Sequence, residues 1–299
     1  MRVLVTGGTG FVGSNLVLRL MELGHDLLIT GHDSEQKLLG FKGKYFQTSL
    51  LGIDWDEIGN IDALFHEAAI NDTTLLDERE MMRANTHASA ALFDYAATHG
   101  CKHIVYASST AVYGASPAPY VEDVGLAPLN PYGVSKLELE KQATAFAAKH
   151  PGIKVVGLRY CNVYGPREWH KGPRASMVHQ LAKQMVQGNP RIFKNGEQKR
   201  DYIYVKDVVR ANLLALKAKE SCIVNCGAGQ ATSFNDVIAI LNKTMGLSRT
   251  PEYIDNPYAD RYQSFTQCDM SLAKEKLGFV PEYGIEEGIA DYFKNGIFA

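Results

Sequence analysis

Short apolar runs alternate with amphipathic helical patterns over roughly the first half of the chain. Residues 2–6 read as a buried strand, and the segment that follows carries apolar residues at helical spacing, namely Val12, Leu16, Leu20 and Leu23. Further buried strands are predicted at residues 25–30, 61–66, 103–107 and 154–160, with an amphipathic helix at 80–99. Strands that alternate with helices in this way favour a parallel sheet covered by helices, so the sequence predicts an α/β fold.

The alternation stops in the second half of the chain. An amphipathic helix is predicted near residues 175–187, a strand–helix unit at 202–219 is expected to return to the main sheet, and a second such unit follows. No low-complexity linker and no internal repeat divides the sequence. We therefore expect residues 1–164, rejoined by 202–228, to form one domain. The remainder of 165–299 is expected to form a smaller, discontinuous, mixed α/β domain that binds substrate.

The composition is that of an ordinary globular protein, with 45% hydrophobic and 21% charged residues among 299. With 31 basic and 33 acidic residues the formal charge is −2, so the charge balance does not indicate nucleic acid or an anionic membrane as partner. No apolar run approaches the roughly 20 residues of a membrane span. The first residues pass directly into a strand pattern, and we therefore expect a cytoplasmic protein.

The five cysteines are scattered and odd in number, which favours reduced thiols over a disulfide framework. Cys222 and Cys226 share one apolar, strand-like run, where packing is a simpler interpretation than metal ligation. We therefore expect no metal site.

A glycine-rich turn lies between the first strand and the first helix. Gly7, Gly10 and Gly13 permit a tight turn, a close approach of the backbone to a pyrophosphate, and close packing of helix on sheet. The helix N-terminus offers N–H groups and a partial positive charge to phosphates. Because strand, glycine turn and helix come in the required order, the sequence predicts a Rossmann-type, doubly wound domain that binds a dinucleotide.

The end of the second strand bears on the choice of cofactor. An NAD site usually places a carboxylate there for the ribose 2′-hydroxyl. This chain has Gly31 and His32 at that place, with Asp33 one or two positions late. Three lysines follow within reach of a 2′-phosphate: Lys37, Lys42 and Lys44. We therefore expect NADP, with NAD as the alternative.

A tyrosine and a lysine at helical spacing offer acid–base chemistry. Tyr132 and Lys136 are four residues apart and project from one helix face. A free tyrosine has a pKa of about 10, but an adjacent ammonium favours the phenolate, which can take a proton from an alcohol. Ser109, at the end of the preceding strand, is the best candidate to hydrogen-bond the reacting oxygen, with Thr110 in reserve. His66 ends another strand, where a structural role is expected.

These motifs together resemble the extended short-chain dehydrogenase/reductases that act on nucleotide sugars. The likeness runs the full length of the chain and includes the sequence block at 159–167. Residues 166–172, 199–205 and 261–267 more narrowly resemble the branch that inverts C6″ of an ADP-linked heptose for bacterial lipopolysaccharide. Residues 48–51 depart from the Asp-rich turn usual in the family, which leaves the adenine contacts open.

The resemblance implies roles for individual residues. Lys136 would hold the nicotinamide ribose and depress the Tyr132 pKa, while Lys171 would be a second acid–base group. Contacts with NADP are implied for Gly7, Gly10, Phe11, Val12, Gly13, Gly31, His32, Glu67, Ala68, Ala69, Asn85, Tyr132, Lys136 and Val163. Contacts with the nucleotide-diphosphate sugar are implied for Ser109, Asn162, Gln180, Phe193, Arg200 and Tyr262, the last two on the diphosphate.

The implied reaction is a transient oxidation at C6″ by tightly bound cofactor, rotation of the keto sugar, and return of the hydride to its other face. Tyr132 would serve one epimer and Lys171 the other; the alternative for Lys171 is a phosphate contact or a solvated loop position. A nucleotide-sugar 4-epimerase shares every motif except the second base, and a non-catalytic NADP sensor is a more distant alternative. The nucleotide, ADP or GDP, stays open, and the family commonly forms homo-oligomers.

Overall fold

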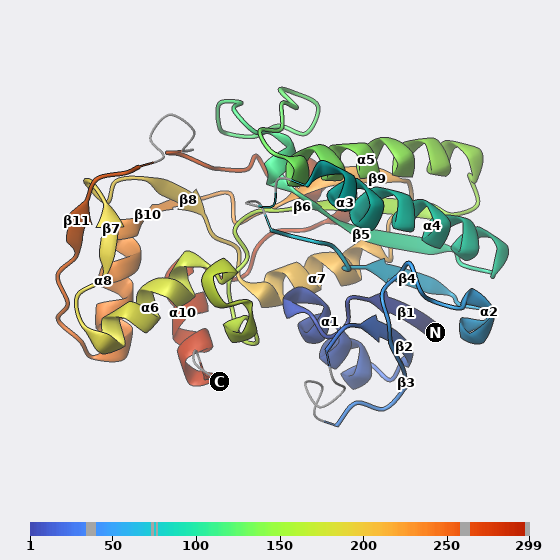
Figure 1. The fold of residues 1–299 in the computed structure, drawn as a ribbon, viewed down its shortest axis with the longest axis horizontal. Helices are drawn as coiled ribbons and strands as arrows, with labels where there is room; N and C mark the ends of the chain where they lie inside the picture. The colour runs from blue at the N-terminus through green and yellow to red at the C-terminus, as the bar shows by residue number, and fades with distance from the viewer. Residues whose placement is uncertain (34–39, 73–74, 76, 258–263, 297–299) are drawn as a thin grey trace.

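A parallel sheet forms the centre of the protein (Figure 1). The structure is a computed structural model that describes residues 1–33, 40–72, 75, 77–257 and 264–296. Within these ranges the sheet has seven strands in the order β3-β2-β1-β4-β5-β6-β9, and every pair is parallel. The strands are β1 (Arg2–Thr6), β2 (Asp26–Gly31), β3 (Lys44–Gln47), β4 (Ala63–His66), β5 (His103–Ser109), β6 (Lys154–Tyr160) and β9 (Cys222–Cys226). The strand order reverses between β1 and β4, which confirms the predicted doubly wound fold.

Helices cover both faces of this sheet (Figure 1). One face carries α1 (Phe11–Glu22), α7 (Val205–Ala215) and α9 (Ser271–Leu277); the other carries α4 (Ala88–Thr98) and α5 (Pro131–Lys149), with the short α2 (Trp55–Ile58) nearby. Val3 and Val5 of β1 pack with Leu16 of α1, whereas Leu4 packs with Leu139 of α5. Since side chains alternate across a strand, both faces of β1 are buried, and its sequence is continuously apolar.

Helix α1 differs from its prediction at its end. Leu16 and Leu20 are buried as expected, together with Val17. Leu23 is 47% exposed because the helix stops at Glu22 and Leu23 is its C-cap residue. The buried stripe is therefore one turn shorter than the apolar spacing predicts.

The helix predicted at 80–99 is interrupted. The chain forms α3 (Glu78–Met82), then a π-helical turn over Arg83–His87, and then α4. Such turns insert one extra residue per hydrogen-bonded ring and are common near functional sites. Here the turn carries Asn85, whose contacts are described below.

The C-terminal part encloses a separate apolar cluster beside the main sheet (Figure 1). Its helices are α6 (Met177–Gln187), α8 (Phe234–Met245) and α10 (Ile285–Lys294). Two small sheets complete it: β8 (Lys199–Asp201) antiparallel to β10 (Ala231–Ser233), and β7 (Arg191–Phe193) parallel to β11 (Glu252–Ile254). No helix in the described ranges is both long and apolar enough to cross a membrane.

Only the helix of the strand–helix unit predicted at 202–219 belongs to the layers around the main sheet. Its helix, α7, packs against α1, but the strand expected before it is not a strand of the main sheet. The nearest strand, β8, pairs with β10, and Tyr204 makes a single bridge to Tyr164. Tyr202 and Tyr204 are buried in the C-terminal cluster, and this packing draws the segment away from the sheet.

Candidate active site

A cavity of about 680 Å³ lies at the carboxyl ends of the main-sheet strands, where open α/β sheets bind their ligands. Its walls come from the glycine turn, the end of β2, the loop after β4, the end of β5, the start of α5 and the loop after β6. Lys171 and residues 174–177, with Arg200 and Tyr202, line it from the C-terminal part. Of the predicted cofactor set, the structure places these in the wall: Gly7, Gly10, Phe11, Val12, Gly13, Gly31, His32, Glu67, Ala68, Ala69, Tyr132, Lys136 and Val163.

The glycine turn has the shape that a dinucleotide phosphate needs. Gly7 has φ +67°, and a Cβ on it would lie 2.8 Å from the backbone N of Ala68. A Cβ on Gly13 would overlap the carbonyl oxygen of Gly7. Gly10 precedes α1 in an extended conformation, and no side chain caps this helix in the described structure. Side chains at Gly7 or Gly13 would fill this turn, so the glycines keep it open. The backbone N–H groups at the start of α1 and the helix dipole face this opening, and the turn therefore fits the pyrophosphate of NAD or NADP.

The other end of the cavity lies at the end of β2, where the sequence predicts the adenosine half of a dinucleotide. Gly31, His32 and Asp33 line it, together with residues 48–51. Lys44 does not reach this place, because its ammonium donates a 3.0 Å hydrogen bond to the Glu57 carbonyl and lies 4.6 Å from the centre of the Phe46 ring. Lys42 is likewise outside the cavity wall, and Lys37 lies outside the described residues. The structure therefore does not place Lys42 or Lys44 in the cavity wall, and their contact with a 2′-phosphate stays a prediction.

His66 has the structural role expected of it. Its two ring nitrogens lie 2.8 Å from the Thr6 hydroxyl and 2.7 Å from the Ser89 hydroxyl, and the ring is 2% exposed. Burial, reinforced by the charge of Lys136, lowers the pKa of His66 to about 3. A neutral imidazole thus joins β1, β4 and α4 beneath the cavity.

Tyr132, Lys136 and Ser109 meet at one wall of the cavity. Asn130 caps α5 by accepting a 2.8 Å hydrogen bond from the Gly133 N–H, and Pro131 occupies the first helical position. This start places Tyr132 beside the end of β5, where Ser109 lies. Burial raises the pKa of Tyr132, a hydrogen bond with Ser109 lowers it, and the charge of Glu67 raises it again.

Lys136 differs from its expected role toward Tyr132. Its ammonium donates a 2.7 Å hydrogen bond to the Ala107 carbonyl and lies 5.9 Å from the centre of the Tyr132 ring. The side chain is 2% exposed, and burial lowers its pKa to about 8 against the charges of Glu67 and Glu140. The net pKa of Tyr132 is raised, so the expected depression by Lys136 is not present in this state.

Lys171 faces the cavity from the segment before α6. Its ammonium lies 5.3 Å from the centre of the Phe11 ring. Burial lowers the pKa of this lysine, which favours the neutral amine, while the charge of Glu168 opposes the shift. Glu168 is fully buried and fixes the segment by accepting hydrogen bonds from the backbone N–H groups of Gly165 and Ser176.

Several predicted residues lie elsewhere. Asn162 and Arg200 line the cavity, but Gln180 and Phe193 do not. The Gln180 side chain donates a 2.7 Å hydrogen bond to the Gly172 carbonyl, so it supports the Lys171 segment from behind. Phe193 belongs to β7, and Tyr262 lies outside the described residues.

Asn85 stands behind the wall instead of in it. Its amide accepts a 2.8 Å hydrogen bond from the Ile70 N–H and donates one of 2.9 Å to the Ile70 carbonyl. It also donates to the Ser135 hydroxyl at 3.1 Å. The side chain, 1% exposed, therefore ties the loop after β4 to α5, and the structure does not place it in the cavity wall where a direct contact with cofactor was predicted.

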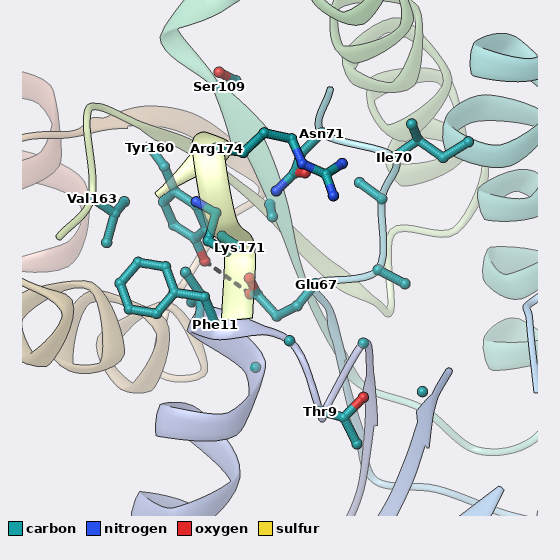
Figure 2. A pocket seen from close by; sticks show the side chains of 18 of the residues that line it. Thr9, Phe11, Glu67, Ile70, Asn71, Ser109, Tyr160, Val163, Lys171 and Arg174 are labelled. Carbon is teal, nitrogen blue, oxygen red and sulfur yellow. Dashed lines mark hydrogen bonds between the residues drawn. The ribbon is translucent and has the colours of Figure 1, made fainter. Parts of the chain in front are cut away.

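Two residues absent from the predicted set, Tyr160 and Arg174, line the cavity. Tyr160, at the end of β6, donates a 2.8 Å hydrogen bond to Oε1 of Glu67 inside the cavity (Figure 2). Arg174 lines the cavity and lies 3.7 Å from an Asp72 carboxylate oxygen. The position of Tyr160 at a strand end was a usable signal in the sequence, but nothing in the sequence links Arg174 to Asp72.

A cluster of buried polar groups was also not foreseen. Cys161, Asp201 and Cys268 offer atoms within 4.8 Å of one another. The Asp201 carboxylate already accepts hydrogen bonds from the backbone N–H groups of Ala228, Gly229 and Cys268. These hydrogen bonds connect the loop after β9 with the C-terminal tail. They also satisfy the acceptors of the buried carboxylate, so its burial is explained without a metal ion.

Comparison with known proteins agrees with this geometry. A model of the NAD dependent epimerase/dehydratase family matches residues 3–227. ADP-L-glycero-D-manno-heptose-6-epimerase of Alkalilimnicola ehrlichii is 37% identical, over 97% of this chain and 96% of that protein. The crystal structure of the Helicobacter pylori ADP-L-glycero-D-manno-heptose-6-epimerase has a TM-score of 0.90 at 36% identity, covering 100% of this chain and 96% of that one. UDP-glucose 4-epimerase of Thermotoga maritima, solved with UDP-glucose, has a TM-score of 0.88 at 30% identity, covering 99% and 98%. The chain therefore belongs to the NAD dependent epimerase/dehydratase family.

Proposed function

We propose that the protein is a nucleotide-sugar epimerase that interconverts ADP-D-glycero-D-manno-heptose and ADP-L-glycero-D-manno-heptose by transient oxidation at C6″. One observation carries this proposal. Tyr132 and Lys171, two groups able to exchange protons, line the same cavity from different parts of the chain. Two epimers present their hydroxyls on different sides, and two acid–base groups on different walls suit both.

The cofactor would supply a hydride acceptor that also returns the hydride, so none is consumed. The glycine turn and the N-terminus of α1 would hold its phosphates, and Lys136 would hold its nicotinamide ribose. Tyr132 would take the hydroxyl proton of one epimer, with Ser109 hydrogen-bonded to the reacting oxygen. Lys171 would do the same for the other epimer, because its lowered pKa makes a neutral amine accessible. Asn162 would contact the sugar and Arg200 the diphosphate.

For the cofactor itself we propose NADP, with NAD as the alternative. The absence of a carboxylate at Gly31 and His32 supports NADP. Asp33 in the cavity wall and the family's dependence on NAD support the alternative. Release of the bound cofactor by denaturation, followed by mass measurement, separates the two by the mass of one phosphate.

We also propose that the two domains expected from the sequence bind different ligands. Residues 1–164 with 202–228 would bind the cofactor, and the rest of 165–299 would bind the nucleotide sugar. The protein would act in the cytoplasm as a homo-oligomer without nucleic acid or membrane partners. Light scattering during size-exclusion chromatography tests the oligomer.

The experiment that tests the function uses the purified holoenzyme and ADP-D-glycero-D-manno-heptose, with the C6″ epimer ratio followed by NMR. We expect drift toward a mixture of epimers and a loss of at least about 100-fold in Tyr132→Phe. Lys171→Met should lose activity, whereas Lys183→Met, which removes an exposed lysine of α6, should not. No drift from a protein that carries its cofactor would contradict the heptose assignment.

The second candidate is a nucleotide-sugar 4-epimerase acting on a UDP- or GDP-hexose. The similarity to the Thermotoga UDP-glucose 4-epimerase favours it. Such an enzyme needs no second base, so Lys171→Met would leave conversion of UDP-glucose nearly unchanged. A 4-epimerase would also convert UDP- or GDP-hexoses faster than the ADP-heptose.

A further inference from the structure

Glu67 is held inside the cavity by a chain of hydrogen bonds that spans three elements. Nδ2 of Asn212, on α7, donates to the Tyr160 hydroxyl at 2.8 Å. This hydroxyl in turn donates to Oε1 of Glu67 at 2.8 Å, the contact that Figure 2 marks with a dashed line. Asn212 is fully buried. The carboxylate therefore has a fixed position although it comes from a loop.

Glu67 lies beside the glycine turn that would hold the cofactor phosphates. The residue directly follows β4, and a Cβ built on Gly7 would lie 3.0 Å from its carbonyl carbon. Its side chain runs from this turn toward Tyr160, on the side where Phe11 and Lys171 lie (Figure 2). Glu67 thus connects the glycine turn with the catalytic wall.

The charge of Glu67 acts on both catalytic groups of α5. It raises the pKa of Tyr132 and opposes the effect of burial on Lys136. Glu140, a buried carboxylate nearby, is paired with Arg159 through two hydrogen bonds of 2.8 Å. Glu67, by contrast, has no lysine or arginine within ion-pair distance in the described part of the chain. Its own pKa is raised to about 7 by burial, so it is ionised above that pH.

We propose that Glu67 is a positioning residue that keeps the bound nicotinamide cofactor in its oxidised state. The proposal rests on the proposed function. The oxidised ring carries a positive charge and the reduced ring none, so a fixed negative charge in the cavity stabilises the oxidised form. During turnover the sugar C–H bond would give its hydride to the cofactor and its O–H proton to one acid–base group. The hydride would then return to the other face of the carbonyl carbon, and the second acid–base group would protonate the carbonyl oxygen. A preference for oxidised cofactor favours that return and opposes release of the keto sugar from an enzyme left reduced.

The test measures redox balance and needs no sugar. Holoenzyme is equilibrated anaerobically with mediator dyes, above the Glu67 pKa of about 7, and bound reduced nicotinamide is read by its absorbance. Glu67→Gln should raise the ratio of reduced to oxidised cofactor about tenfold, which is about 30 mV for a two-electron couple. Glu138→Gln, which removes a partly exposed carboxylate of α5 that pairs with Lys141 outside the cavity wall, is the matched control and should leave the ratio unchanged.

Two further variants separate charge from structure. Glu67→Asp keeps the charge, so the ratio should stay within about twofold of the wild type. Tyr160→Phe removes only the hydroxyl that fixes the carboxylate, so the ratio should rise less than in Glu67→Gln; this variant carries the test if Glu67→Gln does not fold or retain cofactor. An unchanged ratio in Glu67→Gln would overturn the proposal, and so would an unchanged ratio in Tyr160→Phe if Glu67→Gln cannot be measured. Equal rises in Glu67→Gln and in either Glu67→Asp or Glu138→Gln would overturn it too. A failure of heptose epimerisation would leave this readout intact.

Discussion

The ammonium of Lys136 lies 5.9 Å from the centre of the Tyr132 ring and gives its hydrogen bond to the main chain of β5, at Ala107. Burial, not the lysine, dominates the acidity of Tyr132, and it raises the phenol pKa. The tyrosine is therefore a neutral hydroxyl in the protein without ligands, and the approach of the positively charged nicotinamide ring of the oxidised cofactor would favour its phenolate.

This arrangement predicts the ionisation of Tyr132 in cofactor-free protein. An ultraviolet difference titration between the wild type and Tyr132→Phe should show no phenolate signal from this residue below about pH 10, the value of a free tyrosine. Addition of oxidised cofactor should move the signal to lower pH. A phenolate signal at neutral pH in cofactor-free protein would show that Lys136 alone activates the tyrosine.

A methyl group at Gly13 should abolish cofactor retention. Its Cβ would overlap the Gly7 carbonyl, so either the turn or α1 must move. We expect Gly13→Ala to lower the bound cofactor per chain at least about tenfold after purification, because a shift of about 1 Å in a positioned site is costly. Gly152→Ala is the control, since nothing lies within 4 Å of a Cβ there. Equal cofactor content in the two variants would argue against a phosphate cradle at this turn.

The buried pair of Glu140 and Arg159 should dominate the stability of the wall behind Ser109. Each side chain is 3% exposed, and Glu140 also accepts a hydrogen bond from Ser108 at 2.5 Å. Glu140→Gln leaves a buried guanidinium unpaired, and we expect a loss of about 3–5 kcal/mol in the free energy of unfolding by urea. Glu286→Gln breaks the exposed pair with Lys243 and should cost less than about 1 kcal/mol. Similar losses in the two variants would contradict the assignment of this pair as a buried anchor.

His66 should make stability depend on acid pH. Its folded pKa of about 3 lies below its ordinary value of 6.5, so the unfolded chain binds the proton first. Stability from this group is complete above about pH 6.5 and falls as the pH drops toward 3, by up to about 1.4 kcal/mol per pH unit. Urea unfolding at several pH values should show a shallower fall in His66→Gln than in the wild type. Parallel slopes would mean that His66 is not held neutral by the fold.

The parts of the fold that the sequence predicts well are set locally. β1 and β6 match their predicted bounds because most positions in each run are apolar and buried, and α5 (Pro131–Lys149) carries Tyr132 and Lys136 on one helix as their spacing predicts. Tyr202 and Tyr204 read as a strand for the same reason, but their partners are the helices of the C-terminal cluster. The local pattern of apolar residues indicates that a segment is buried, but it does not show whether the segment packs in the main sheet or in the C-terminal cluster.

The sequence predicts the motifs of the site, but it does not predict the hydrogen bonds between residues that lie far apart in the chain. Glu67, Tyr160 and Asn212 are separated by 93 and 52 residues, and only the fold brings their side chains together. The spacing of Tyr132 and Lys136 correctly puts them on one face, yet it does not reveal that Ala107 competes for the ammonium. Resemblance alone suggested Gln180 and Asn85 as ligand contacts, whereas their hydrogen bonds hold the cavity wall from behind.

The most direct test of the proposed reaction is the fate of a deuterium atom placed on C6″ of ADP-D-glycero-D-manno-heptose. If the hydride leaves C6″ and returns to the same carbon inside one cavity, the product epimer will keep the deuterium, and none will appear in solvent. Mass spectrometry and NMR of the isolated epimer measure both. Deuterium lost to solvent during epimerisation, or the absence of any epimer from cofactor-loaded protein, would contradict the proposed mechanism.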